Sequence, residues 1–308
     1  HSINDRDFRV WLATHGARRS TIDSALVKAL YDLAFAYEDG NENNPQVEAG
    51  SMLLGAMRMS TEYRGSPIYR MKGGMGDVVF APLFETLSDR GVDFRFFRFA
   101  KGLELSADKR QVDRVVVARQ VDLSAGTSHY APLIDIPVGT KSQKCWPNEP
   151  NWAQLAGPRL PAYQLERGGP EVATETYVRG TDFDVVIVAT PLGGNFVDEL
   201  SAESDQWQDM RKKVKTVATQ SVQLWTNRTS YQMGWKFQTS VHAAYVGPFA
   251  SWADMSHLLP LESWPVSAAP TGLFYLCGVA QDPVSSTAIY DGVSDWLDTF
   301  GTQLWPNA

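Results

Sequence analysis

Helical periodicity is clearest near the two ends of the chain. Residues 5–38 are predicted to be helical, because apolar residues recur there at the three- and four-residue spacing of one helix face. The recurring positions are Leu26, Ala29, Leu30, Leu33 and Ala34. A second helix is predicted over residues 48–64 and an amphipathic helix over residues 291–300.

Apolar runs predict β-strands in the middle and in the last third of the chain. Residues 92–99 alternate and lead into residues 103–105, and residues 112–117 return after a turn at residues 108–110, so these runs predict a hairpin. The continuous apolar run within residues 181–191 is typical of a strand that is buried on both faces of a parallel sheet. Further strands are predicted over residues 218–227, 241–246 and 272–279. The stretch of about 124–170 contains many Pro and Trp residues and predicts a long surface loop.

The segment from Met71 to Phe97 has the order of a nucleotide-binding βαβ unit, with a glycine turn, a helix and a strand. Such a unit needs G-x-G-x-x-G, whose third glycine lets the helix pack closely on the strand. Gly74 and Gly76 supply the first pair, but Val79 occupies the third position. The sequence contains no other candidate for this fingerprint. A nicotinamide-binding enzyme that uses Gly74–Met75–Gly76 directly remains an alternative.

Composition and charge exclude several classes of function. The chain has 308 residues, of which 44% are hydrophobic, and can bury a substantial core. Its net charge of -7 argues against nucleic acid as a partner. Cys145 and Cys277 lack C-x-x-C spacing, so we expect no disulfide framework, no metal site and a reducing, cytoplasmic compartment. No apolar run reaches the roughly 20 residues that span a bilayer, so we expect no membrane span.

Three segments, taken in order, resemble the flavin-dependent amine oxidase and phytoene-desaturase-like superfamily of FAD oxidoreductases. KGGMGDVVFAPLFETLSDRGVDFRFF is similar to that family's turn–helix–strand unit. The strand pair from Phe94 to Val117 is similar to the family's hairpin, and FDVVIVATPLGG is similar to the strand that leads toward the cofactor. The order and spacing of the three segments agree over the central part of the chain.

The resemblance implies a mixed α/β (α+β) fold. In this fold, part of a glutathione-reductase-type FAD-binding domain is interleaved with a substrate domain made of an antiparallel sheet and helices. We expect residues 1–66 to form the helical part of the substrate domain and residues 67–195 to form part of the FAD-binding domain. Residues 196–308 are expected to complete the substrate domain.

The sequence lacks the family's two main flavin-binding motifs. One is an N-terminal G-x-G-x-x-G unit, whose backbone N–H groups and helix dipole hold the pyrophosphate. The other is a C-terminal glycine-rich stretch with a Gly-Asp pair. The chain therefore resembles the middle portion of such a protein, either a fragment of a nicked precursor or one subunit of a split enzyme. We expect FAD as the cofactor, a hetero-oligomer with other polypeptides that carry the missing motifs, and little flavin binding by this chain alone.

The resemblance also implies positions for the cofactor. Ala100 follows a predicted strand and is expected beside the adenine, through its backbone. Ala189, Thr190 and Pro191 are expected near the ribose or pyrophosphate; the alternative is that they only end a strand. Gly74 is expected near the cofactor, or it serves only to permit a tight turn.

Aromatic side chains of the antiparallel sheet are candidates for substrate contacts, since flat rings can hold a substrate against a flavin and exclude water. Trp235 and Tyr245 are the residues selected, with Trp225, Tyr231 and Tyr275 as further candidates. Ordinary core packing is the competing interpretation for each of them. The histidines are scattered without a partnering pattern, so the sequence names no catalytic residue.

The expected function is FAD-dependent oxidation, in which the flavin takes a hydride from a small amine or amino-acid-type substrate. One alternative is FAD-dependent desaturation or isomerisation of a hydrophobic polyene. Another is a non-catalytic scaffold subunit of a split flavoenzyme.

Overall fold

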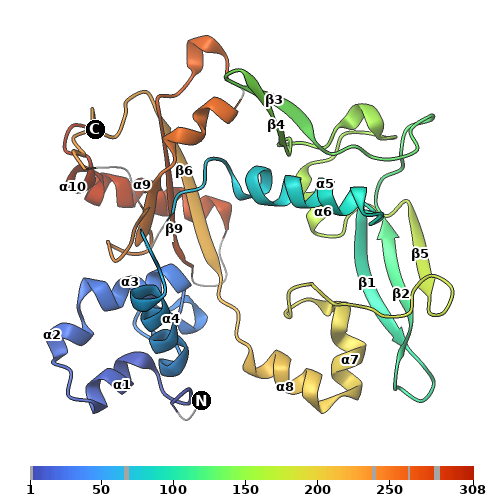
Figure 1. Cartoon of the computed structure of the whole chain (residues 1–308), viewed down its shortest axis with the longest axis horizontal. Helices are drawn as coiled ribbons and strands as arrows, with labels where there is room; N and C mark the ends of the chain where they lie inside the picture. Colours follow the sequence, from blue (N-terminus) through green and yellow to red (C-terminus); the bar gives the residue numbers. More distant parts are fainter. Residues whose placement is uncertain (1–2, 66–68, 238–240, 263, 281–284) are drawn as a thin grey trace. The chain divides into compact units, whose positions relative to one another are not determined.

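The computed structural model describes residues 3–65, 69–237, 241–262, 264–280 and 285–308. The chain divides into two compact units (Figure 1). Unit 1 comprises His1–Gly74 and Thr216–Ala308, and unit 2 comprises Met75–Lys215. Every strand ladder among the described residues is antiparallel, and helices accompany the sheets, so the predicted α+β mixture is confirmed. The assignment of the units to substrate and FAD-binding domains stays a prediction.

The helices of unit 1 lie at the two ends of the chain. They are α1 (Phe8–Thr14), α2 (Arg19–Ile22), α3 (Ala25–Ala34), α4 (Ala49–Thr61), α9 (Ser286–Trp296) and α10 (Thr302–Leu304). Residues 5–38 are therefore not one helix. Asp7 caps the start of α1, Gly16 follows its end in the left-handed region (φ 84°), and the side chain of Ser24 caps α3. The helix predicted over residues 48–64 is confirmed as α4.

A four-stranded sheet with the order β6-β9-β8-β7 occupies the C-terminal part of unit 1. Its strands are β6 (Thr219–Thr226), β7 (Val241–His242), β8 (Ser251–Asp254) and β9 (Gly272–Val279). The predictions of β6 and β9 are confirmed. The strand predicted over residues 241–246 is only two residues long, because Ala244 adopts φ 62° and breaks the extended backbone.

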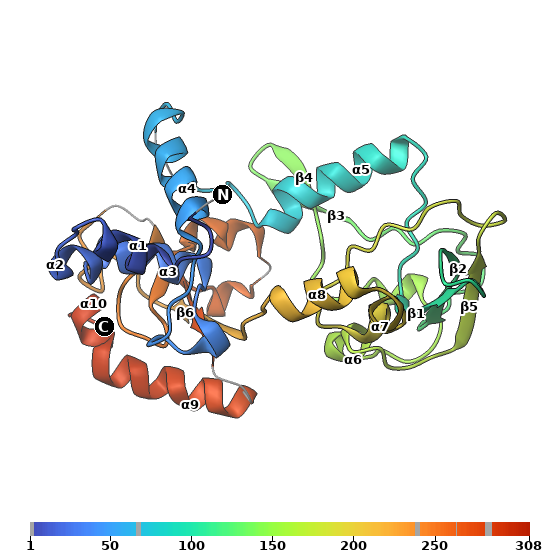
Figure 2. The ribbon, with the colours of Figure 1, turned by 90° about the horizontal axis from the view of Figure 1, so that it is seen from below.

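The described residues of unit 1 form two hydrophobic clusters. The first packs one face of the sheet against α9 and α10 (Figures 1 and 2), with Phe274 and Trp252 on the strands and Trp296 on α9. The second joins the N-terminal helices to the end of β9, where Val279 packs with Phe8 and with other buried residues of the helices. The second cluster therefore joins the two separate chain segments of unit 1.

Unit 2 holds two small sheets and several short helices. The strands are β1 (Arg98–Leu105), β2 (Val112–Arg119), β3 (Ile134–Val138), β4 (Lys141–Cys145) and β5 (Ala173–Val178). The helices are α5 (Ala81–Asp89), α6 (Ala162–Glu166), α7 (Asp198–Glu203) and α8 (Asp205–Lys213). A π turn over Gly76–Phe80 runs directly into α5, and the two form one continuous helical rod (Figure 2).

Three predictions for unit 2 need correction. Residues 92–96 lie outside any ladder, and pairing begins at Arg98, so the start of the predicted strand 92–99 is wrong, whereas the predicted hairpin with residues 112–117 is confirmed as the antiparallel pair β1–β2. The predicted loop 124–170 contains the β3–β4 hairpin, which was not expected, and the short helix α6, which is compatible with the prediction of a loop with one short helix. The predicted strand 181–191 is not a strand, and its only bridge joins Phe183 to Arg179. Val185 and Ile187 are exposed and Val186 and Val188 are half-buried, since no described strand pairs with residues 184–190.

Over the described part of the chain, no helix is long and apolar enough to cross a membrane.

Candidate functional site

A cavity of about 1080 Å³ lies within unit 2, beside the β1-β2-β5 sheet. Its walls come from the segment before β1, from the residues after β2, and from β5. The lining residues include Phe96, Phe97, Arg98, Arg119, Tyr130, Glu175 and Tyr177. Residues that lie far apart along the chain thus meet in one hollow, which contains both aromatic rings and charges.

The strand register explains why charged side chains gather at this cavity. Arg98 is paired with Arg119, while Ala100 and Glu175 are both paired with Val117. Directly paired residues, and residues two apart on one strand, share a face of the sheet. Ala100, the residue expected beside an adenine, therefore lies on the same sheet face as Arg98, Arg119 and Glu175, although it is not among the lining residues.

Glu175 is the centre of a network of charged hydrogen bonds. Its Oε2 accepts a bond from Arg98 Nε at 2.8 Å and another from the Tyr177 hydroxyl at 2.8 Å. Arg119 Nε lies 3.1 Å from Glu175 Oε1, in an ion pair without good hydrogen-bond geometry. Burial alone would raise the pKa of Glu175, but the bonds from Arg98 and Tyr177 and the two guanidinium charges lower it overall. Glu175 is thus a carboxylate that neutralises two arginines.

Aromatic rings form another wall of the cavity. The ring of Phe97 lies edge-on to that of Tyr130, with centroids 5.0 Å apart, and Phe96 lies 5.4 Å from the same ring. Tyr130 is held in place, since its hydroxyl accepts a hydrogen bond from the backbone N–H of Asn151 at 2.8 Å. Edge-on and tilted arrangements of this kind are the favoured geometry for aromatic pairs.

Phe97 also has a strained backbone. Its φ of 55° is unusual for a bulky residue and costs on the order of 1–3 kcal/mol. A hydrogen bond from the backbone N–H of Gln120 to the carbonyl of Phe97, at 2.9 Å, holds this conformation. The bend places Phe97 in the cavity wall immediately before β1.

The cavity fits one part of an adenine dinucleotide better than the other. The aromatic wall suits a flat ring such as adenine. A pyrophosphate needs free N–H donors or cations, whereas the three arginines of the wall pair with carboxylates of the same wall. Arg95, for example, is bound to Asp93 at 2.8 Å. The lining therefore does not match a pyrophosphate, and we derive no chemical step through FAD from these residues.

The end of the apolar run does not reach this cavity. Ala189, Thr190 and Pro191 are exposed and are absent from its lining. Within the same run, the side chains of Val185 and Ile187 are 79% and 87% exposed. The structure thus presents an extended apolar segment without a partner among the described residues, where the sequence predicts a buried strand.

The remaining predicted site residues belong to unit 1. Gly74 lies at its boundary, next to a bend at Lys72 and Gly73. Trp235 and Tyr245 both pack against the cluster between the sheet and α9. Tyr245 lies edge-on to the Trp296 ring at 5.8 Å, and Trp235 lies 5.0 Å from the Trp252 ring. The two residues thus contribute to the core of unit 1.

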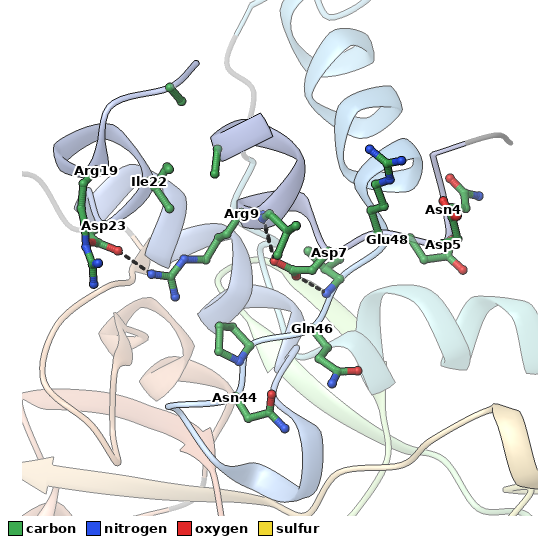
Figure 3. A pocket seen from close by; sticks show the side chains of 16 residues that line it. Asn4, Asp5, Asp7, Arg9, Arg19, Ile22, Asp23, Asn44, Gln46 and Glu48 are labelled. Carbon is green, nitrogen blue, oxygen red and sulfur yellow. Dashed lines mark hydrogen bonds and ion pairs between the residues drawn. The ribbon is translucent and has the colours of Figure 1, made fainter. Parts of the chain in front are cut away.

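A second, polar pocket of about 970 Å³ lies within unit 1 beside α1 (Figure 3). Arg9 points at Asp23, with an ion pair of 2.5 Å, and Asp7 accepts bonds from the backbone N–H groups of Arg9 and Val47. The hydroxyl of Tyr31 also donates to Asp7, at 2.9 Å. Because these charges cap a helix and tie chain segments together, we interpret this pocket as structural.

Metal-binding groups and cysteine thiols are two further candidates for chemistry among the described residues. No group of three or more His, Cys, Asp or Glu among them could hold a metal ion. Burial raises the pKa of both free thiols, those of Cys145 and Cys277, so they are poor nucleophiles.

Sequence reasoning missed the network around Glu175, because β5 was not predicted. The alternation of Thr174, Glu175, Thr176 and Tyr177 is the signal that could have revealed that strand.

Comparisons with protein-family models, with curated proteins and with solved structures found no match. No relative therefore assigns a role to any residue of the cavity.

Proposed function

We propose that this chain is the middle portion of an FAD-dependent oxidoreductase of the amine oxidase and phytoene-desaturase-like superfamily. In this proposal, unit 2 is part of the FAD-binding domain and unit 1 belongs to the substrate domain. Other polypeptides supply the G-x-G-x-x-G unit and the C-terminal flavin motif. The complete assembly takes a hydride from a small amine or amino-acid-type substrate.

The observation that carries the proposal is the apolar segment around Val185 and Ile187, which pairs with no described strand. Four consecutive apolar residues, Val185 to Val188, follow Asp184. Exposing such a run to water is unfavourable by roughly 25 cal/mol for each Å² of apolar surface. A strand that is apolar on both faces is typical of the centre of a parallel sheet. A partner polypeptide that pairs with this segment would remove its apolar side chains from water and satisfy its backbone groups.

The cavity of unit 2 supports the same proposal. Its aromatic wall is suited to adenine, and it lies on the sheet face that carries Ala100. The lining of the cavity does not match a pyrophosphate, which agrees with a phosphate site that the helix N-terminus of another polypeptide supplies. A non-catalytic scaffold is the second candidate, because the arginines of the cavity are already neutralised by carboxylates.

The experiment is an absorption spectrum of the native material, combined with a denaturing gel and intact mass. Oxidised flavin bands at about 370 and 450 nm, together with further polypeptides, would support a multi-chain flavoenzyme. Bleaching of the bands by an amine or amino acid would then identify the substrate class. A colourless single chain of 34.2 kDa would exclude an active oxidase in this material.

A double variant and a control variant test the role of the apolar segment. Val185→Lys combined with Ile187→Lys is expected to leave the fold stable to within about 0.5 kcal/mol, because both side chains are exposed. The same variant is expected to lose the co-purifying polypeptides and the flavin. Val266→Lys is the matched control, because Val266 is 97% exposed in unit 1. Retention of flavin and partners by the double variant would contradict the proposal.

A further inference from the structure

Two tryptophans on the surface of unit 1 share one carboxylate. Trp225 lies near the end of β6, an edge strand of the four-stranded sheet, and Trp264 lies in the connection before β9. Both indole N–H groups donate to the same atom, Oε2 of Glu262, at 3.3 Å from Trp225 and 2.7 Å from Trp264. We call these three residues the tryptophan clamp.

The geometry leaves both rings available to a ligand. The ring centroids are 5.9 Å apart and the ring planes are inclined by 54°. Trp225 is 42% exposed and Trp264 is 40% exposed. The shared carboxylate fixes the orientation of both rings while large parts of them remain in contact with solvent, whereas Trp252, Trp296 and Trp305 are almost fully buried in the core of the same unit.

The charge of the clamp is not neutralised within the described part of the chain. Glu262 forms no ion pair with a described residue, and the second carboxylate oxygen, Oε1, accepts no hydrogen bond from one. No described cation lies over either indole ring. Electron-rich ring faces therefore lie beside a carboxylate whose charge no described cation neutralises, on a chain whose net charge is already -7.

We propose that the tryptophan clamp is a binding site for a small organic ammonium ion. Indole is the side-chain ring that attracts cations best, and quaternary ammonium ligands are commonly recognised by aromatic rings. The carboxylate adds charge attraction, and Oε1 can accept a hydrogen bond from a primary ammonium group. The site lies wholly within unit 1 and does not depend on the proposed flavin chemistry.

The chemistry of the clamp favours a cation over a neutral ligand such as a sugar. Sugar recognition needs several hydrogen-bonding groups at the rim of the rings, and both indole N–H groups are already used by Glu262. A purely apolar ligand would leave the charge of the carboxylate without a counter-ion and its Oε1 without a donor among the described residues. An ammonium ion can contact the faces of both indole rings and also neutralise the charge of Glu262.

The test uses the full chain and two probes of similar shape. Tetramethylammonium chloride is the cation, and tert-butanol is its neutral counterpart, with sodium chloride added to equalise ionic strength. The readout is the indole ¹H–¹⁵N resonances, which Trp225→Phe and Trp264→Phe assign. The indole of Trp296 is an internal reference, because it is 3% exposed and donates to the carbonyl of Val246 at 3.0 Å.

Tetramethylammonium is expected to shift the resonances of Trp225 and Trp264 in a saturable way, whereas tert-butanol leaves them unchanged. Each Trp→Leu variant is expected to weaken binding about two- to fivefold, as is usual for one exposed cation–π contact. Glu262→Gln is expected to weaken it by a similar factor, while Glu262→Asp, which keeps the charge, retains binding.

Three results would overturn the proposal. They are unchanged indole resonances at high tetramethylammonium, equal shifts with tert-butanol, and equal affinities of Glu262→Gln and the unaltered chain. The second result would mean that the clamp is only an apolar surface patch.

Discussion

Replacement of Asp32 by alanine is expected to destabilise unit 1 strongly, because this carboxylate joins its two chain segments. Asp32 is 5% exposed. Its Oδ1 accepts a bond from the Tyr37 hydroxyl at 2.5 Å, and its Oδ2 accepts one from the backbone N–H of Ala244 at 3.0 Å. The second bond fixes Ala244 in its left-handed conformation, and burial together with the bond to Asp32 raises the pKa of Tyr37.

The magnitude follows from the two donors that Asp32→Ala leaves unpaired. A buried donor without a partner, such as the Tyr37 hydroxyl, costs about 1–3 kcal/mol, and the half-buried N–H of Ala244 costs less, so the sum lies below the roughly 6 kcal/mol upper value for two buried donors. Removing a buried carboxylate also removes its desolvation penalty, which offsets part of this loss. We therefore expect a decrease of about 2–4 kcal/mol in the free energy of unfolding, and about 1–2 kcal/mol for Tyr37→Phe. Because the two residues share one hydrogen bond, their effects should not be additive.

Urea unfolding followed by tryptophan fluorescence is the appropriate assay. Seven of the ten tryptophans belong to unit 1, so the signal reports mainly on that unit. Asp291→Ala is the matched control, because Asp291 is an exposed residue of α9 without a hydrogen bond or ion pair among the described residues. A change below about 0.5 kcal/mol for Asp32→Ala would refute the reasoning, since that is the range of ordinary surface substitutions.

Three further predictions concern single residues. Burial lowers the pKa of His242, whose ring stacks on the ring of Trp252. The neutral side chain therefore contributes its full stability at pH values above 6.5, the ordinary pKa of histidine. This stability is lost as the pH falls from 6.5 through the lower pKa of the folded state. Acid titration of the unfolding free energy should show a smaller loss for His242→Phe, and an unchanged loss would exclude this role. Gly278→Ala is expected to cost about 3 kcal/mol or more, since its Cβ would lie 1.8 Å from the Pro248 carbonyl oxygen; a wild-type melting temperature would contradict the steric argument. The pKa of Glu175 is lowered in the folded state, so its ionised carboxylate stabilises unit 2 at pH values above 4.5, the ordinary pKa of a glutamate side chain. This stability is lost as the pH falls through the lower pKa of the folded state. Glu175→Gln should therefore unfold with a weaker pH dependence below pH 4.5 in circular dichroism, and equal curves would be the contrary result.

Sequence patterns predicted helices and strands correctly where a local pattern of apolar residues determines the structure. Residues 272–279 are apolar on both faces and form the buried strand β9, as predicted. Helix α4 follows from its apolar face. The exposed run at Val185 and Ile187 has an equally strong apolar pattern, but a strand also needs a neighbouring strand, and a sequence window does not contain that information.

The candidate site was harder to predict than the fold, because it depends on pairing between distant residues. Arg98 and Glu175 are 77 positions apart and meet only because β2 lies between their strands. The family resemblance selected Ala100, whose expected role stays a prediction, and no sequence pattern pointed to the charged residues on the same sheet face. The shared use of Glu262 by two tryptophans likewise depends on the path of the connection before β9, which no periodicity describes.

The division of unit 1 into two chain segments has a consequence for synthesis on the ribosome. Residues of unit 2 emerge as one continuous stretch and can fold at once, whereas Phe8 and Val27 must wait for Val279 to complete their cluster. At roughly 5–20 residues per second, that delay is on the order of 10–50 s. During this time the apolar faces of the N-terminal helices remain without their partner strand. We therefore expect the nascent chain to expose a surface that chaperones recognise until the last strand has left the ribosome.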